Sequence, residues 1–443
     1  MIYLLSLSIF LLLILSAAMF KKDLTAPSFL LMAGFSLSVM CCCIYANEWE
    51  FHDYRLMGLI ISGLLGFLLF SWITYYFDRR GMKKMKKFDK NKKVLQISQI
   101  KLLLYLLFQI LLMFIQIYNL YRNFGGGSLA DAIGNYYNAN MLGTLKYKSP
   151  ISSIGNILNM PATYLILYVT SYNIVHNNKN CIWLYVNIVV SFMNSLMDGT
   201  RTTLFMYMIS FFVMYIIQKQ RISGWKKNIN LKNLFKLLVL FMIGIVGFNF
   251  LFFLQGRSLS DITVVDLIAN YLGAPIKNLE LFIGDKISAD KIFGETTFMN
   301  TYSWFNELLG GEIFNIPDIY TYRWINGKIL GNVYTQFMPL YCDFGIVGTF
   351  IAMGIIGTFC QKIYDRVRIS PNVCGVDYSL LFYSYVAFAI VFCFFSNKFF
   401  ELVFARALIY NIIGVWLFDI LFFRMKMRNG HLVVVRLKNE KVS

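Results

Sequence analysis

Three arginines stand where a phosphate group could be held. Arg201 closes a very short polar turn between two long apolar runs, and Arg257 and Arg323 lie in the longest polar segment, residues 255–331. A guanidinium group presents a planar fork of donors that fits two phosphate oxygens at once. Two of them also have a structural alternative, because Arg201 could pair with Asp198 and Arg257 could snorkel to the interface as a cation beside lipid headgroups. Phosphate binding is therefore one of two uses that these positions predict.

Three carboxylates near these arginines could serve as a general base. Asp198 shares the turn of Arg201, Glu307 lies in the long polar segment, and Asp343 follows shortly after it. A carboxylate within hydrogen-bond reach of a hydroxyl can take its proton as the oxygen attacks. The sequence does not choose among the three.

Asp343 stands out because it falls inside the apolar run 333–357. A carboxylate within a membrane span is costly, and it is functional by default when it faces the interior of the bundle. Arg406 lies at a similar depth and is the expected partner. An Asp–Arg pair there could also serve only to fix the packing of the two spans.

Aromatic side chains accompany the charges of the long polar segment, and they include Trp304, Tyr320, Tyr322 and Trp324. Rings that stack on sugar faces, beside charged groups that bond sugar hydroxyls, suit a carbohydrate site. The same residues are also common wherever a loop meets a membrane surface. We therefore expect either sugar binding or anchoring at the interface.

Some chemistries have no residues to support them. No Gly-rich phosphate loop followed by Lys and Ser or Thr occurs, which argues against nucleotide hydrolysis. No Asp-x-Asp and no His/Cys cluster with metal-ligand spacing is present. We expect neither a metal ion nor another cofactor.

The segments that carry these residues are separated by apolar runs long enough to cross a bilayer. Hydrophobic residues make up 58% of the 443, charged residues only 14%, and the mean hydropathy is +0.59. We expect an all-α polytopic membrane protein with about eleven transmembrane helices, forming one integral membrane domain over residues 1–443. The predicted spans are 2–20, 27–46, 56–77, 101–120, 154–175, 181–197, 202–217, 237–254, 333–357, 378–396 and 402–423.

The distribution of lysine and arginine predicts the orientation. The basic loop 78–100 and the tail 424–443 fall on one side and are expected in the cytoplasm. Loops 121–150 and 255–331 then face outward, so the candidate site residues lie on the outer face of a plasma membrane. The net charge of +18 is explained by this topology and by anionic lipid headgroups, and no nucleic acid partner is expected. Within the outer loop, residues 263–283 have helical apolar spacing interrupted at Pro275, which predicts one or two amphipathic helices lying on the membrane.

Two stretches and one spacing carry a resemblance to a known family. They are the outward turn MDGTRTTLFMYMI, the later stretch NVYTQFMPLYCDFGIVGTFIAMGIIGTF, and fifteen residues between Arg257 and Gly273. In this order the chain resembles the bacterial oligosaccharide repeat-unit polymerases, the Wzy-type O-antigen and capsular polysaccharide polymerases. The motifs cover about residues 190–360, and the layout of spans and loops matches over the whole chain.

The resemblance implies a glycosyltransferase with an architecture similar to the GT-C class of lipid-sugar transferases. Its donor would be a growing glycan on undecaprenyl pyrophosphate, and its acceptor a new repeat unit on the same lipid. Arg201, Arg257 and Arg323 would hold the pyrophosphate, and one of the three carboxylates would be the base. A chain-length regulator and a flippase would be its protein partners.

Two other classes of protein compete with this interpretation. An O-antigen ligase uses the same donor and is expected to need an outward histidine, for which His52 is the sole candidate. A lipid-linked oligosaccharide flippase or another transporter is expected to show pseudo-symmetric halves and charges at the midplane. No internal repeat is visible in the sequence, and its polarity is concentrated on one face.

Overall fold

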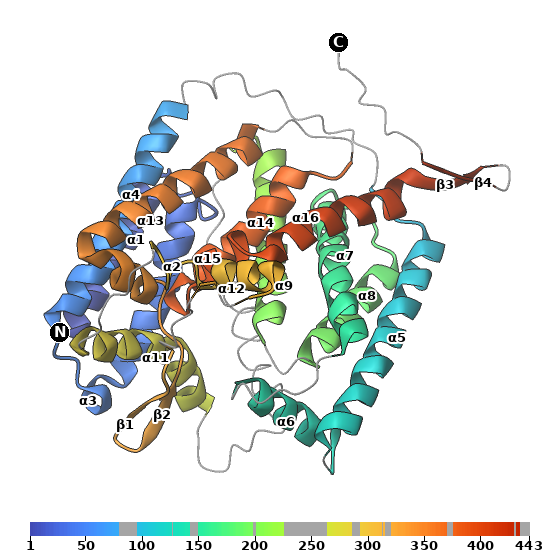
Figure 1. Cartoon of the computed structure of the whole chain (residues 1–443). Coiled ribbons are helices and arrows are strands. Elements are labelled where there is room, and N and C mark those ends of the chain that lie inside the picture. Colours follow the sequence, from blue (N-terminus) through green and yellow to red (C-terminus); the bar gives the residue numbers. More distant parts are fainter. Residues whose placement is uncertain are drawn as a thin grey trace. The chain divides into compact units, whose positions relative to one another are not determined.

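The structure is a computed structural model of the chain, and most of what it describes is helical (Figure 1). The described residues are 1–78, 95–125, 127–141, 149–197, 201–225, 264–285, 293–311, 313–314, 320–369, 375–428 and 431–434. Arg257, Asp198 and the predicted span 237–254 lie outside them.

Seven helices of the described residues are long and apolar enough to cross a membrane. They are α1 (Ile2–Met19), α2 (Pro27–Ile44), α4 (Tyr54–Asp78), α5 (Gln99–Phe124), α9 (Thr202–Ile222), α13 (Phe337–Ile369) and α16 (Arg406–Asp419), which a π-helical turn extends to Arg424. Each coincides with a predicted span. The chain is thus a helical membrane protein.

Three further predicted spans are helical as well. They are α7 (Pro150–Val175), the fifteen-residue α8 (Ile182–Leu196) and α14 (Tyr378–Val391), which a 3₁₀ turn extends to Phe394. Two of these, Ile182–Leu196 and Tyr378–Phe394, are apolar but shorter than a typical span. Eleven crossings therefore stay a prediction.

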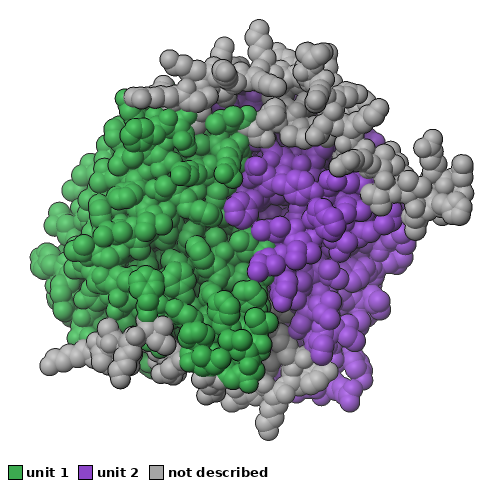
Figure 2. Space-filling view, turned by 45° about the horizontal axis from the view of Figure 1, so that its top comes forward, with its two compact units in different colours: residues 1–86, 262–370, 385–408 green, residues 87–261, 371–384, 409–443 purple. Residues whose placement is uncertain are grey.

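The chain forms two compact units, each made of separate stretches of sequence and coloured separately in Figure 2. Unit 1 contains residues 1–86, 262–370 and 385–408. Unit 2 contains residues 87–261, 371–384 and 409–443.

In unit 1, α4 and α13 run side by side, and glycines set how closely they approach (Figure 1). A Cβ atom on Gly66 of α4 would come within 2.3 Å of the Phe350 carbonyl oxygen, and one on Gly357 within 2.6 Å of the Phe67 carbonyl oxygen. Small residues at such contacts let helix backbones pack closely inside a membrane. Within α13, Gly345 has a φ of 65° and interrupts the helical conformation, which glycine tolerates without a steric cost.

The predicted amphipathic segment forms one helix, α11 (Val264–Gly284), so its helical nature is confirmed. The predicted break at Pro275 is wrong, because the helix continues through the proline. Two side chains of α2 support it there: Ser38 donates to the Leu272 carbonyl at 2.6 Å and the Cys42 thiol to the Gly273 carbonyl at 3.3 Å. A Cβ on Gly273 would lie 3.1 Å from the Cys42 backbone nitrogen, so glycine permits the close approach to α2.

Short elements complete unit 1. They are α3 (Ala46–Trp49), α12 (Met299–Leu309), α15 (Lys398–Val403) and an antiparallel hairpin of β1 (Arg323–Ile325) and β2 (Lys328–Gly331). The hairpin turns through Asn326 and Gly327, both with positive φ, as a two-residue type I′ loop requires. Lys328 forms an ion pair of 2.6 Å with Glu48 of α3, so the hairpin is attached to that helix.

Unit 2 is held together by neutral polar side chains between its helices. Gln109 of α5 donates to the Asn159 side chain of α7 at 3.0 Å, and Asn194 of α8 donates to the Gln109 carbonyl at 3.1 Å. Hydrogen bonds of this kind join helices where apolar burial alone gives little driving force. The unit also contains α6 (Leu129–Met141) and, within the predicted tail, a hairpin of β3 (Met425–Arg428) and β4 (His431–Val434).

Candidate active site

The hairpin of unit 1 places Arg323 at the centre of a polar cluster. The Arg323 Nε–H donates to the Tyr334 hydroxyl at 3.0 Å, and its terminal nitrogen forms an ion pair with Asp285, just beyond the end of α11. The Tyr334 hydroxyl in turn donates to the Thr321 carbonyl at 2.9 Å. Tyr334 is fully buried, whereas 20% of the Arg323 side chain is exposed. The cation is therefore fixed in direction and still open to solvent.

Arg323 stays positively charged in the folded protein. Partial burial works to lower the pKa of Arg323, but the hydrogen bonds that it donates to Asp285 and Tyr334, together with the charge of Asp285, outweigh burial and raise the pKa above the usual value. A permanently charged fork that keeps an exposed edge could accept a second anion. An incoming phosphate would share this cation with Asp285 or displace that carboxylate.

Three of the four predicted sugar-binding aromatics surround β1. Tyr322 and Trp324 lie with ring centres 6.1 Å apart, and both are exposed. The Tyr320 ring is 6.0 Å from the ring of Tyr334, and burial raises the pKa of the Tyr320 phenol, so it stays neutral. The fourth, Trp304, lies on α12 against Phe305. Tyr320 and Arg323 thus both lie against Tyr334, whereas Tyr322 and Trp324, the two neighbours of Arg323 in the chain, lie against one another.

The carboxylate of Asp343 accepts hydrogen bonds from the turn that precedes α12. Its two carboxylate oxygens accept hydrogen bonds from the Thr296 hydroxyl at 2.7 Å, the Thr297 N–H at 2.7 Å and the Thr296 N–H at 3.2 Å. The prediction that Arg406 is its partner is wrong. Arg406 forms an ion pair with Glu307 of α12 instead.

Glu307 is therefore the more accessible of the two described carboxylates. Its side chain is 58% exposed, and that of Arg406 is 47% exposed. An ion pair this open is easily broken and reformed in water. Glu307 can approach an incoming hydroxyl without losing a structural role, whereas Asp343 cannot.

Arg201 belongs to unit 2, where it stands directly before α9 as the N-cap residue. It is only 5% exposed. The arginine is thus buried within its unit at the start of a helix, and the predicted tight turn before it lies outside the described residues. Its predicted neighbours Asp198 and Arg257 lie outside the described residues.

Several polar residues of the candidate site and of α11 could not be identified as important from the sequence. Asp285 looks like an ordinary loop residue, and Tyr334 falls within a predicted span, until the fold brings both to Arg323. Lys277 and Glu280 of α11 form a buried pair at 2.5 Å, and Glu280 also accepts from the His52 N–H at 2.6 Å. His52, the histidine of the ligase alternative, has an exposed ring 3.6 Å from the Glu50 carboxylate.

Within the part of the chain that the structure describes, no three His, Cys, Asp or Glu side chains come together as metal ligands would. Comparison of the chain with known protein families, curated proteins and solved structures finds no match. The site must therefore be interpreted from its own geometry.

Proposed function

We propose that the chain is a membrane glycosyltransferase that joins oligosaccharide repeat units carried on undecaprenyl pyrophosphate. The growing glycan leaves its lipid carrier and is transferred to a hydroxyl of a new lipid-linked repeat unit. The product is an O-antigen, a capsule or another exopolysaccharide, made at the outer face of a bacterial plasma membrane. The resemblance of the sequence to the repeat-unit polymerases motivates this class of reaction.

The observation that carries the proposal is the surroundings of Arg323. The guanidinium of Arg323 is held by Tyr334 and Asp285 and remains partly exposed, and the two neighbours of Arg323 in the chain, Tyr322 and Trp324, carry exposed rings. A lipid-linked sugar presents the two groups that such a place recognises, a pyrophosphate and a sugar ring. The segment that carries these residues lies between helices long enough to cross a membrane, so a substrate anchored in the lipid can reach it.

The reaction needs positive charge at the leaving group and a base at the acceptor. The acceptor oxygen forms a bond to the anomeric carbon of the donor, the bond from that carbon to the pyrophosphate oxygen breaks, and the electron pair stays on the pyrophosphate. Arg323, with Arg201 and Arg257 as further candidates, stabilises this developing charge. The hydroxyl proton goes to a carboxylate, for which Glu307 is favoured over Asp343 by its exposure.

The decisive experiment supplies the purified protein, in lipid nanodiscs, with repeat units linked to undecaprenyl pyrophosphate. We expect glycans of several repeat units, and one undecaprenyl pyrophosphate released for each bond formed. If glycan appears only on a lipid A core acceptor, the protein is a ligase. If repeat units cross the bilayer of vesicles without any bond being formed, it is a transporter. Either result would replace the polymerase proposal.

A further inference from the structure

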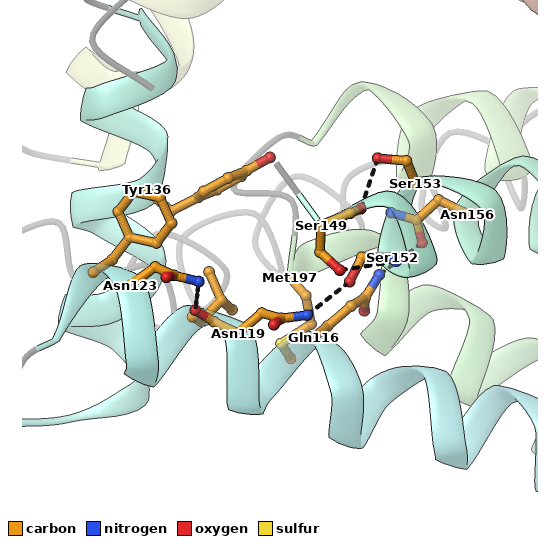
Figure 3. Close-up of a pocket in the computed structure, with 11 residues that line it drawn as sticks. Gln116, Asn119, Asn123, Tyr136, Ser149, Ser152, Ser153, Asn156 and Met197 are labelled. Atoms are coloured by element: carbon orange, nitrogen blue, oxygen red, sulfur yellow. Dashed lines mark hydrogen bonds between the residues drawn. The ribbon is translucent and has the colours of Figure 1, made fainter. Parts of the chain in front are cut away.

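Unit 2 contains a small pocket of about 50 Å³ where α5, α6 and α7 meet. Amide and hydroxyl side chains dominate its lining: Gln116, Asn119 and Asn123 of α5, and Ser149, Ser152, Ser153 and Asn156 at the start of α7. Tyr136 reaches toward it from α6 (Figure 3). No residue that lines the pocket in the described part of the chain carries a charge. The pocket is therefore polar but neutral.

The lining is ordered by its own hydrogen bonds. The Gln116 amide donates to the Asn156 side chain at 2.7 Å, and the Asn119 amide donates to the Ser152 hydroxyl at 3.3 Å, as Figure 3 shows. The Tyr136 ring is held edge-on by Phe124, with ring centres 5.1 Å apart. These groups are fixed in place before any ligand arrives, which reduces the entropy lost on binding.

One buried polar atom in the lining has no hydrogen-bond partner among the described residues. Gln116 is only 4% exposed, and within the described residues its side-chain oxygen has no hydrogen-bond partner. A buried acceptor without a donor costs free energy, so it is usually met by a water or by a ligand. A hydroxyl entering the pocket would satisfy this oxygen.

The chemistry of the lining selects among ligand classes. A phosphate would bring negative charge to a lining that offers no cation among the described residues. A sugar ring brings neutral hydroxyls that both donate and accept, which amides and serines match. At about 50 Å³ the pocket admits the hydroxyl-bearing edge of such a ring, and not the whole ring. On the predicted topology, this end of α5 and α7 faces outward.

We propose that this pocket binds a neutral sugar residue through Gln116, Asn119 and Ser152. The inference deepens the proposed function, on which it rests: the pocket would hold a sugar of the lipid-linked repeat unit in unit 2. Gln116, Asn119 and Ser152 lie outside the two stretches that carry the sequence resemblance.

The test measures saturation-transfer NMR from the full-length protein in lipid nanodiscs, without sugar-headed detergents. The probes are free glucose, galactose, rhamnose and N-acetylglucosamine, with glycerol and inorganic phosphate as comparators. We expect at least one sugar to bind, and Asn119→Leu to weaken that binding about tenfold, as loss of one or two hydrogen bonds implies. Asn180→Leu, in the connection between α7 and α8, is the matched control and is expected to bind as the unchanged protein does.

Ser153→Met provides a second variant, because it fills the pocket and leaves the Gln116 and Asn119 bonds in place. Binding of no sugar, or equal binding by the unchanged protein and both pocket variants, would overturn the proposal. So would pocket-dependent binding of glycerol alone, which would indicate a lipid headgroup. Sugar binding without joining of repeat units would support the pocket and contradict the polymerase function. Joining of repeat units without sugar binding in the pocket would contradict the pocket and support the polymerase function.

Discussion

Arg323 donates its Nε–H to the hydroxyl of Tyr334, a residue with no exposed surface, at 3.0 Å. A buried phenol thus sets the direction of an arginine whose outer edge is open. Two residues eleven positions apart are joined because the hairpin folds back before α13 begins. Tyr334 is therefore a positioning residue for the cation proposed to hold pyrophosphate.

The first prediction concerns this cation. Arg323→Ala should reduce long glycan in cells about ten- to a hundredfold at unchanged protein level, because charge-assisted hydrogen bonds of about 1.5–3 kcal/mol are lost. Arg323→Lys should restore activity only in part, since lysine lacks the planar fork. Tyr334→Phe keeps the cation but frees its direction and should have a smaller effect.

The matched control for this series is Arg55→Ala. Arg55 is also an arginine of unit 1 paired with an aspartate, Asp53 at 2.6 Å, and it is exposed. It should leave glycan length unchanged. Near-normal glycan from Arg323→Ala would remove the pyrophosphate role, whereas equal losses from both variants would point to folding. Arg201→Ala and Arg257→Ala are expected to reduce long glycan as Arg323→Ala does.

The second prediction concerns the two described carboxylates. Asp343→Asn places an amide against N–H donors of Thr296 or Thr297, which should cost about 1–3 kcal/mol of stability and lower activity only as the folded fraction falls. Glu307→Gln should reduce polymerisation strongly without moving the thermal unfolding midpoint. The opposite pattern, stable but inactive Asp343→Asn with active Glu307→Gln, would assign the base to Asp343.

The third prediction concerns the buried pair of α11. Lys277 and Glu280 each have only 5% of their side chains exposed. Glu280→Ala should destabilise the purified protein by about 3–5 kcal/mol, because it leaves a buried ammonium uncompensated. Replacing both by Met should be much milder. Lys328→Met, which breaks the exposed pair with Glu48, should barely change the unfolding midpoint. Equal midpoints for Glu280→Ala and Lys328→Met would contradict the importance of the buried pair.

The fourth prediction concerns metal ions. Fixed arginine charge can stabilise a leaving pyrophosphate without a cation, and the sequence has no Asp-x-Asp. Purified protein should therefore polymerise lipid-linked repeat units in excess EDTA at close to its untreated rate. A large loss that magnesium or manganese restores would show that carboxylates converge on an ion.

The fifth prediction concerns orientation. A reporter fused after Lys291 should be active only outside the cytoplasm, and one fused after Lys87 only inside, because most of the basic residues lie in alternate loops. Alkaline phosphatase and fluorescent protein fusions at both positions provide the measurement. Reversed activities at the two positions would place the Arg323 cluster in the cytoplasm and exclude a reaction at the outer face.

Helices were predictable from the sequence because the requirement for apolar length is local. Every predicted span that falls in the described residues is helical, although the ends differ: α5 runs on to Phe124 and α13 to Ile369. Polar residues can extend a helix beyond the hydrocarbon region, so hydropathy alone does not mark its end. The continuity of α11 through Pro275 was not predictable, since it depends on donors from α2 that are more than 230 residues away in sequence.

Side-chain partners were the least predictable part of the candidate site. The similar depth of Asp343 and Arg406 in the sequence suggested that they pair. Residues 293–298 instead form a turn whose N–H groups donate hydrogen bonds to both carboxylate oxygens of Asp343. That left Arg406 to pair with Glu307, 99 residues away. The polar pocket was not predictable from the sequence, because serines and asparagines are common at helix ends. Only the packing of α5 against α7 brings these side chains together.

The interruption at Gly345 has a consequence for how the chain fits a bilayer. At about 1.5 Å per residue, the 33 residues of α13 would measure about 50 Å if straight, much more than the ~30 Å of hydrocarbon. Beyond Gly345 the helix is about 36 Å long, a length that a modest tilt accommodates. The first arm, with Asp343 at its end, is then free to lie at the headgroup level. In that arrangement the carboxylate of Asp343, which hydropathy places within the hydrocarbon, lies at the membrane surface.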